Sequence, residues 1–162
     1  MIWAKSNITR QLNTVPWAPL GGGVLTGKYT VADLGEVGSD SPAGTRRDHA
    51  MANGTLTARG LDIADVVVDV ARELGASAAQ VALAWTLRNP SVTSSLIGAR
   101  TVEQLQQNIS ALDVLFDESQ LDRLQAVSAV DLGFPHEFLT RPMVRSVTTG
   151  RTTVRPRPVR TW

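Results

Sequence analysis

The stretch that decides the predicted fold is Ser-Ser-Leu-Ile-Gly-Ala-Arg-Thr-Val-Glu-Gln-Leu-Gln-Gln-Asn, residues 94–108. A short β-rich run, residues 92–99, leads through Gly98 into a helix that begins after Thr101. Thr101 and Gln104 have the spacing of a capping box. The apolar positions of this helix recur with helical spacing and are Val102, Leu105, Ile109 and Leu112. A strand that ends at a helix N-terminus favours an anion, and a phosphate is the expected ligand.

Two further helices are predicted before this stretch. In residues 61–75 apolar side chains recur at i, i+3, i+4 and i+7, which is the pattern of a helix that packs one face on a core, and Gly75 fits a C-cap. Ser77 and Gln80 form a capping box for the second helix. That helix is apolar nearly all round until Asn89-Pro90, and we therefore expect it to be buried.

The N-terminal part of the chain is predicted to hold a second strand. Residues 13–20 read as a short strand, and Gly21-Gly22-Gly23 follow at once. Glycines at the end of a strand let backbone N–H groups approach a phosphate, although a flexible turn is the alternative. Residues 30–60 have little periodicity and predict a long loop, which includes Arg46 and Arg47. Loops of this length are often lids or binding loops.

Beyond the central stretch, Asp117 and Gln120 cap a predicted helix over residues 118–130. Its buried side is expected to carry Leu121, Leu124 and Val127. From Ser146 onward the chain shows no periodicity, and we assign it to coil.

Composition limits the possible functions. With 162 residues, 43% of them hydrophobic and 19% charged, the chain has the composition of one soluble globular domain. It contains no cysteine, which excludes disulfides and thiolate metal sites. The two histidines, His49 and His136, are expected to be solvated, and no metal site is predicted. No signal peptide or membrane-spanning run is recognisable, so we expect a cytoplasmic protein.

Charge is distributed unevenly along the chain. All 15 acidic residues and ten of the 16 basic residues lie at or before Glu137, so this part carries a net charge of −5. The remaining six basic residues are Arg141, Arg145, Arg151, Arg155, Arg157 and Arg160. Such a tail can bind nucleic acid, but a solvated, poorly ordered terminus is the interpretation we favour. The predicted boundary therefore divides residues 1–140 from a basic tail, 141–162.

Three motifs resemble those of the aldo-keto reductase family. Val-Pro-Trp-Ala-Pro-Leu-Gly-Gly-Gly-Val-Leu-Thr-Gly-Lys-Tyr, residues 15–29, resembles its seventh-strand motif. Ala-Ala-Gln-Val-Ala-Leu-Ala-Trp, residues 78–85, resembles the helix before its eighth strand, and residues 96–108 resemble its signature for the adenosine phosphate. The resemblance covers about residues 14–138. Members fold as an eight-stranded (β/α) barrel and reduce aldehydes and ketones by hydride transfer from NADPH.

The resemblance implies an NADP(H) site. Trp17 matches the position whose ring stacks on the nicotinamide, and Lys28 and Arg46 match basic positions that reach the pyrophosphate. Gln107 stands where many members have glutamate. The implied cofactor-binding set is Trp17, Ala18, Leu20, Gly21, Gly23, Lys28, Arg46, Gly98, Arg100, Gln104, Gln107 and Asn108.

The catalytic residues of the family are not matched. Its Asp, Tyr, Lys and His tetrad belongs to the first half of the barrel, and no position here aligns with any of the four. Tyr29, the single tyrosine, falls in the seventh-strand motif. Two parallel strands cannot close a barrel, so we expect an α/β, partial TIM-barrel segment completed by self-association or by a complementary barrel half.

Two functions therefore remain open. The chain is either the NADP(H)-binding C-terminal part of an aldo-keto reductase, inactive alone, or a non-catalytic oligomerising or interaction module derived from that fold. The substrate cannot be deduced from these motifs.

Overall fold

The computed structural model describes residues 14–35, 44–150 and 152. Helices dominate this part of the chain, and 3₁₀ helices are labelled η. The elements in chain order are η1 (Gly21–Thr26), η2 (Val31–Leu34), α2 (Arg46–Ala52), α3 (Ala58–Leu74), α4 (Ala78–Leu87), α5 (Val102–Ile109), η3 (Ser110–Asp113), α6 (Glu118–Ser128), α7 (His136–Thr140) and α8 (Pro142–Thr149). The start of the predicted N-terminal strand, residues 36–43 of the predicted loop and the last arginines (Arg151, Arg155, Arg157, Arg160) lie outside the described residues.

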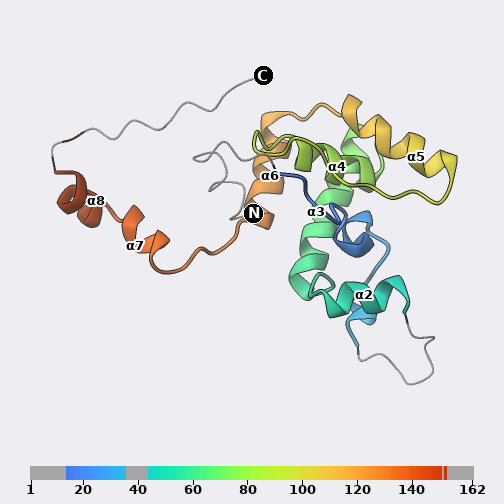
Figure 1. Ribbon diagram of the computed structural model, residues 1–162, viewed down its shortest axis with the longest axis horizontal. Coiled ribbons are helices and arrows are strands. Elements are labelled where there is room, and N and C mark those ends of the chain that lie inside the picture. Colours follow the sequence, from blue (N-terminus) through green and yellow to red (C-terminus); the bar gives the residue numbers. More distant parts are fainter. Residues whose placement is uncertain (1–13, 36–43, 151, 153–162) are drawn as a thin grey trace.

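Helix α3 lies at the centre of the body, with η1, α4 and α6 packed against it (Figure 1). Its apolar stripe forms the main core with residues of α4 and α6. The buried members of this core are Val67, Val70, Ala71, Val81, Ala82 and Leu124. The predicted stripe of residues 61–75 and the expected burial of the following helix are both confirmed, since Val81 to Leu83 are at most 2% exposed.

A second buried cluster joins η1 and α2 to the first turns of α3. Its members are Val24, Ala50, Leu56, Leu61 and Ala64. The chain passes so close to α3 here that a Cβ added to Gly27 would lie 2.5 Å from Cγ2 of Val68. Because Gly27 also has a φ of +72°, only glycine fits this contact.

The two predicted strands are much shorter than expected. In the described residues they form one parallel bridge, between Thr14 and Val92. The Thr14 N–H donates to the Ser91 carbonyl at 2.9 Å, and the Thr93 N–H donates to the Thr14 carbonyl at 3.0 Å. Pro16 and Pro19 cannot donate to a ladder, which explains why the pairing does not extend along residues 13–20. The strand predictions for residues 13–20 and 92–99 are therefore wrong in extent.

The predicted long loop contains helices. Both η2 and α2 begin with a capping box, Thr30 with Asp33 and Thr45 with Asp48. Helix α3 begins at Ala58, three residues earlier than expected, because the Thr57 side chain accepts from the Gly60 N–H. The structureless loop over residues 30–60 is thus a wrong prediction for the described part of that range.

Helix ends elsewhere follow the predicted caps with one exception, at Thr101. The Gly75 C-cap and the boxes at Ser77 and Asp117 are confirmed. The box at Thr101 is incomplete, because Oε1 of Gln104 accepts from the Arg100 N–H instead of the Thr101 N–H. Helix α8 ends at Thr149, so the coil predicted from Ser146 onward is wrong for its first four residues.

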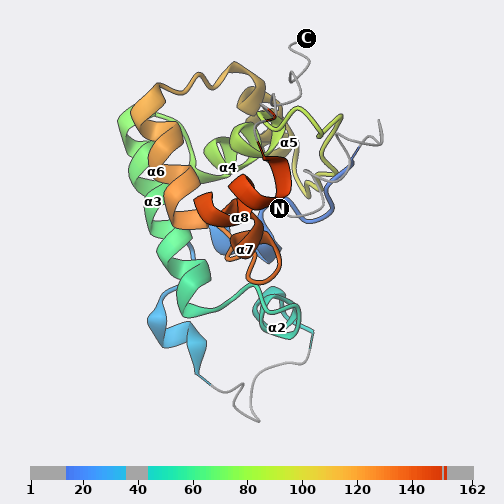
Figure 2. The ribbon, with the colours of Figure 1, turned by 90° about the vertical axis from the view of Figure 1, so that its left-hand side faces the viewer.

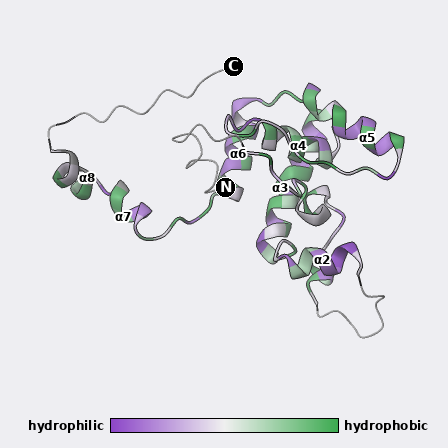
Figure 3. Ribbon diagram, viewed as in Figure 1, coloured by the Kyte–Doolittle hydropathy of each residue, from purple (hydrophilic) through white to green (hydrophobic). Residues whose placement is uncertain are grey.

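Within residues 14–35 and 44–150, no helix is long and apolar enough to cross a membrane. The hydropathy colouring in Figure 3 shows apolar residues on α5, α7 and α8 as well as in the central helices. On α5 they are not buried: Val102 is 66% and Ile109 is 53% exposed.

An ion pair ties α6 to α3 beside the main core. The Arg123 guanidinium donates to both carboxylate oxygens of Glu73, at 2.8 Å to Oε1, and the Gln120 amide donates to Oε2 at 3.2 Å. The hydrogen bonds from Arg123, and then from Gln120, lower the pKa of Glu73. The negative charge of Glu73 is therefore favoured in the folded state.

Replacing Leu83 by alanine tests the helical core. Leu83 is 2% exposed in α4, so Leu83→Ala should lower the free energy of unfolding by about 2–5 kcal/mol through lost burial and a residual cavity. Urea unfolding followed by circular dichroism measures this change. Leu115→Ala is the matched control because Leu115 is 81% exposed, and its effect should stay within about 0.5 kcal/mol. Equal effects of the two changes would contradict the described core.

The pH dependence of unfolding tests the ion pair. Because folding lowers the pKa of Glu73, the pair stabilises fully above the ordinary glutamate pKa of about 4.3. That stabilisation is lost as the pH falls through the lower pKa of the folded state. The urea midpoint of Glu73→Gln should therefore fall less between pH 7 and pH 3 than that of the parent chain. Asp122→Asn, an exposed carboxyl on α6, is the control and should keep the parent's slope; an unchanged slope in Glu73→Gln would argue against the pair.

Candidate functional site

A tight glycine turn forms the first part of the candidate site. Four residues in it have positive φ: Ala18 (52°), Gly21 (57°), Gly22 (67°) and Gly23 (93°). For Ala18 this conformation costs roughly 1–2 kcal/mol, so the surrounding structure must impose it. The N–H groups of Gly21 and Gly23 donate to the carbonyls of Ala18 and Leu20, both at 2.9 Å. These donors close the turn, so they do not face a phosphate, and the space beside Gly22 and Gly23 is occupied by Ala50 and by the Lys28 side chain.

The Lys28 side chain folds back over this turn. A Cβ added to Gly23 would lie 2.9 Å from both Cε and Nζ of Lys28. The ammonium also lies 4.7 Å from the centroid of the Tyr29 ring, a cation–π contact. An ammonium group is thus held beside the turn on an exposed side chain, where it can pair with an anion. Any larger residue at Gly23 would displace it.

Backbone pairing brings a second segment, residues 96–98, to the end of the molecule where the glycine turn lies. The Leu96 N–H donates to the Pro16 carbonyl at 3.1 Å. Because the two segments run parallel, Trp17 and Gly98 follow the pairing at the same end. Trp17 is 77% exposed, so its ring is free to stack on a planar ligand. Gly98 has open space where a side chain would begin.

The N-terminus of α5 forms the second part of the site. The Arg100 N–H donates to Oε1 of Gln104 at 3.0 Å, and the Gln104 N–H donates to Oγ1 of Thr101 at 3.2 Å. Hydrogen bonds from its own backbone N–H, and then from the Thr101 side chain, lower the pKa of Glu103. The N-terminus of α5, which attracts anions, therefore already interacts with a carboxylate of the chain, that of Glu103.

Glu103 is a site residue that the sequence predictions missed. The signal was available, because an acidic residue in the first turn of a helix interacts favourably with the helix dipole. The capping boxes of η2 and α2 were also missed, although Thr30-x-x-Asp33 and Thr45-x-x-Asp48 fit the pattern.

The predicted site residues fall into two groups, and Arg46 belongs to neither. Around the glycine turn lie Trp17, Ala18, Leu20, Gly21, Gly23 and Lys28, of which Leu20 packs against the main core. Around α5 lie Gly98, Arg100, Gln104, Gln107 and Asn108. Arg46 is the exposed first residue of α2. Figures 1 and 2 both show α2 low and α5 high on the body, so the structure does not bring Arg46 to Arg100.

Arg47, the neighbour of Arg46, is a structural residue. Its Nε donates to the Asp33 carbonyl at 3.1 Å, and its guanidinium donates to the Gly35 carbonyl at 2.8 Å. These bonds fix α2 against η2 and leave the Arg46 side chain exposed to solvent.

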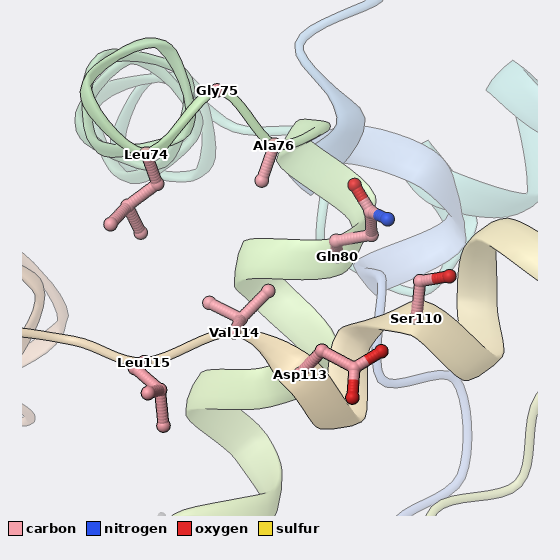
Figure 4. Close-up of a pocket in the computed structure, with 8 residues that line it drawn as sticks. All are labelled: Leu74, Gly75, Ala76, Gln80, Ser110, Asp113, Val114 and Leu115. Atoms are coloured by element: carbon pink, nitrogen blue, oxygen red, sulfur yellow. The ribbon is translucent and has the colours of Figure 1, made fainter.

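An open groove of about 410 Å³ lies elsewhere, between the α3–α4 turn and η3 (Figure 4). It is lined by Leu74, Gly75, Ala76, Gln80, Ser110, Asp113, Val114 and Leu115. None of these is a predicted site residue, and the side-chain oxygen Oε1 of Gln80 accepts from the Ser77 N–H. With one carboxylate and no basic side chain in its lining, the groove does not suit an anionic ligand.

Comparisons with known proteins identify the family. The sequence model of the aldo/keto reductase family matches residues 7–129. A probable voltage-gated potassium channel subunit beta of Oryza sativa subsp. japonica is 37% identical over 121 residues, which are 74% of this chain and 36% of the relative.

Two bacterial relatives show the same partial coverage. An uncharacterized oxidoreductase of Bacillus subtilis, YrpG, is 38% identical over 72% of this chain and 32% of the relative. L-glyceraldehyde 3-phosphate reductase of Escherichia coli is 37% identical over 62% of this chain and 29% of the relative. The chain thus spans about a third of the length of these relatives. It belongs to the aldo/keto reductase family.

Proposed function

We propose that the chain is the NADP(H)-binding C-terminal part of an aldo-keto reductase. One observation carries this proposal: the hydrogen bond from Leu96 to Pro16 puts the Trp17 turn and the Gly98–Arg100 segment at one end of a parallel pair. A dinucleotide that bridges them would meet an exposed aromatic ring at one part of the site and an arginine at the other.

The groups present fit such a ligand. Trp17 offers an exposed indole face for the nicotinamide ring, and Lys28 places an ammonium beside the glycine turn for the pyrophosphate. Arg100 is exposed and has no ion-pair partner among the described residues, so its guanidinium is available for the 2′-phosphate. Gln104 fixes the Arg100 backbone through its side-chain oxygen. Gln107 and Asn108 continue along α5, where the family resemblance expects the adenine.

Carbonyl reduction needs more than this site. The nicotinamide would supply the hydride, and an acid must supply the proton. Tyr29 is the only tyrosine in the chain, and its ring packs against the second core cluster beneath the Lys28 ammonium. We therefore expect the chain alone to bind the dinucleotide without turnover. In this proposal the acid comes from a further polypeptide segment, in keeping with the longer sequences of the relatives.

A second candidate function is a non-catalytic oligomerising module. It is favoured by the apolar side chains that the described body leaves exposed, above all along α5.

Removing the Arg100 guanidinium tests the proposed phosphate contact. Arg100→Ala should weaken NADPH binding by about tenfold or more, the size expected when a hydrogen bond to a charged group is lost, and should leave NADH binding nearly unchanged. Titration of NADPH fluorescence measures both affinities. Arg88→Ala is the matched control, because Arg88 is an exposed arginine at the end of α4.

Two results would contradict parts of this proposal. The absence of saturable NADPH binding by the parent chain up to millimolar cofactor would reject the proposed function. The other, which would reject only the expected lack of turnover, is rapid NADPH oxidation with a reactive aromatic aldehyde by the purified chain.

Neutralising Glu103 tests the competition between its carboxylate and a phosphate at the start of α5. Glu103→Gln should tighten NADPH binding by about three- to tenfold at low salt, because a negative charge is removed from the helix end that the phosphate approaches. The gain should be smaller for NADH, which lacks the 2′-phosphate. Glu118→Gln, the equivalent change in the first turn of α6, serves as the control. Weaker NADPH binding by Glu103→Gln would show that the carboxylate assists the ligand instead.

A further inference from the structure

The segment that follows α2 folds back onto the end of that helix. We define the Thr55 turn as residues 50–56. Its hydrogen bonds converge on the Ala50 carbonyl oxygen, which accepts from the Thr55 N–H at 2.9 Å, from the Leu56 N–H at 3.0 Å and from the Thr55 hydroxyl at 2.9 Å. A backbone carbonyl oxygen has two lone pairs, so these three donors leave neither of them free. The two N–H groups close the turn, and the hydroxyl bond fixes the side chain of Thr55.

The Thr55 turn packs directly against the glycine turn. A Cβ added to Gly22 would lie 3.1 Å from Cβ of Ala50 and 3.7 Å from Oγ1 of Thr55. A Cβ added to Gly21 would lie 3.9 Å from Cβ of Thr55. Ala50 is 0% exposed and belongs, with Leu56, to the second buried cluster. Because a packed interior leaves little free volume, the position of the glycine turn depends on that of the Thr55 turn.

These contacts reach the Lys28 ammonium through two adjacent glycines. Gly22 packs on Ala50, and Gly23 is in contact with the Lys28 side chain, whose Cε and Nζ would lie 2.9 Å from an added Cβ. A shift of Gly22 away from Ala50 would therefore move Gly23 and remove the contact that holds Lys28 beside the turn.

We propose that the Thr55 hydroxyl is a positioning group for the nicotinamide and pyrophosphate part of the dinucleotide site. It does not touch the ligand. By bonding the Ala50 carbonyl it holds the Thr55 turn against Gly21 and Gly22, and it thereby sets the position of the Lys28 ammonium. This role rests on the proposed function, but it concerns only the glycine turn and not the 2′-phosphate contact of Arg100. NADPH and NADH share the part of the ligand that meets the glycine turn, so both depend on Thr55 to the same degree.

Replacing Thr55 by valine tests this role. Thr55→Val keeps the branched shape and removes the hydroxyl donor, while the Ala50 carbonyl keeps its two backbone donors, so the variant should fold. It should weaken NADPH and NADH binding by the same factor, about three- to tenfold, the size expected when one neutral hydrogen bond is lost. Thr55→Ser keeps the hydroxyl and should bind both cofactors like the parent. Fluorescence titration measures the affinities, and circular dichroism establishes that each variant is folded.

Thr86→Val is the matched control. The Thr86 hydroxyl donates to the Ala82 carbonyl at 2.9 Å within α4, and Thr86 is half-buried like Thr55. Its removal costs the same kind of hydrogen bond at a position outside both turns. Thr86→Val should therefore keep the parent's affinity for NADPH and NADH.

Hydrogen exchange in the ligand-free chain tests the same contact without a cofactor. The N–H groups of Gly21 and Gly23 are bonded within the glycine turn, so in Thr55→Val they should exchange about three- to tenfold faster than in the parent. In Thr86→Val their exchange should be unchanged. Nuclear magnetic resonance of the labelled chain measures both rates.

The outcomes separate this role from the proposed function. If the parent binds NADPH but Thr55→Val keeps its affinity, loses affinity for NADPH alone, or leaves the exchange of Gly21 and Gly23 unchanged, the positioning role is overturned and the dinucleotide site stands. A loss of the same size in Thr86→Val also overturns the role, since the effect is then not specific to the Thr55 turn. If the parent shows no saturable NADPH binding, the proposed function and the role of Thr55 both fall.

Discussion

Burial of the apolar stripe of α3 is the interaction on which the described fold depends. Four other elements of the body pack on this helix: η1 and η2 at its first half, and α4 and α6 along its second. Val70 at its middle is fully buried. By contrast, the parallel pairing contributes one bridge and a few backbone hydrogen bonds. The helical layer therefore holds the body together, and it also supports the glycine turn, since Gly27 passes directly against Val68.

The sequence allowed good prediction of features that depend on neighbouring residues. Capping at Ser77 and Asp117, the Gly75 end of α3 and the burial of α4 all follow from residues within a few positions of one another. The strands failed for the opposite reason. A strand is stabilised by neighbours that are distant in sequence, and residues 92–99 find only the proline-containing segment that follows Thr14. The helical period of α5 correctly indicated one apolar face, but a period cannot reveal whether any surface covers that face.

In the candidate site, too, local features were predicted better than the contacts between segments distant in sequence. The motifs gave Trp17, Lys28 and Arg100 as residues that could meet one ligand, and the structure orders two of their segments through a single parallel pairing. It separates Arg46 from the α5 residues. Sequence reasoning left the glycine N–H groups either to a phosphate or to a turn, and Gly21 and Gly23 use them within the turn. A glycine motif specifies where positive φ is tolerated, and the hydrogen-bond partners of its N–H groups depend on the turn that forms.

Helix α5 carries both the proposed ligand contacts and exposed apolar side chains. Its first turn and polar side carry the residues proposed to contact a dinucleotide, and its opposite side exposes large apolar groups. In the described part of the chain, this eight-residue helix has no buried residue and is held by its contacts with α4 and η3 and by the Thr101 cap. Any ligand that binds Arg100 and Gln104 must therefore bear part of the free-energy cost of ordering α5. A protein surface that covers the apolar side of α5 would also order the helix. Binding of that surface and binding of the dinucleotide should therefore favour one another, even though the two partners do not touch.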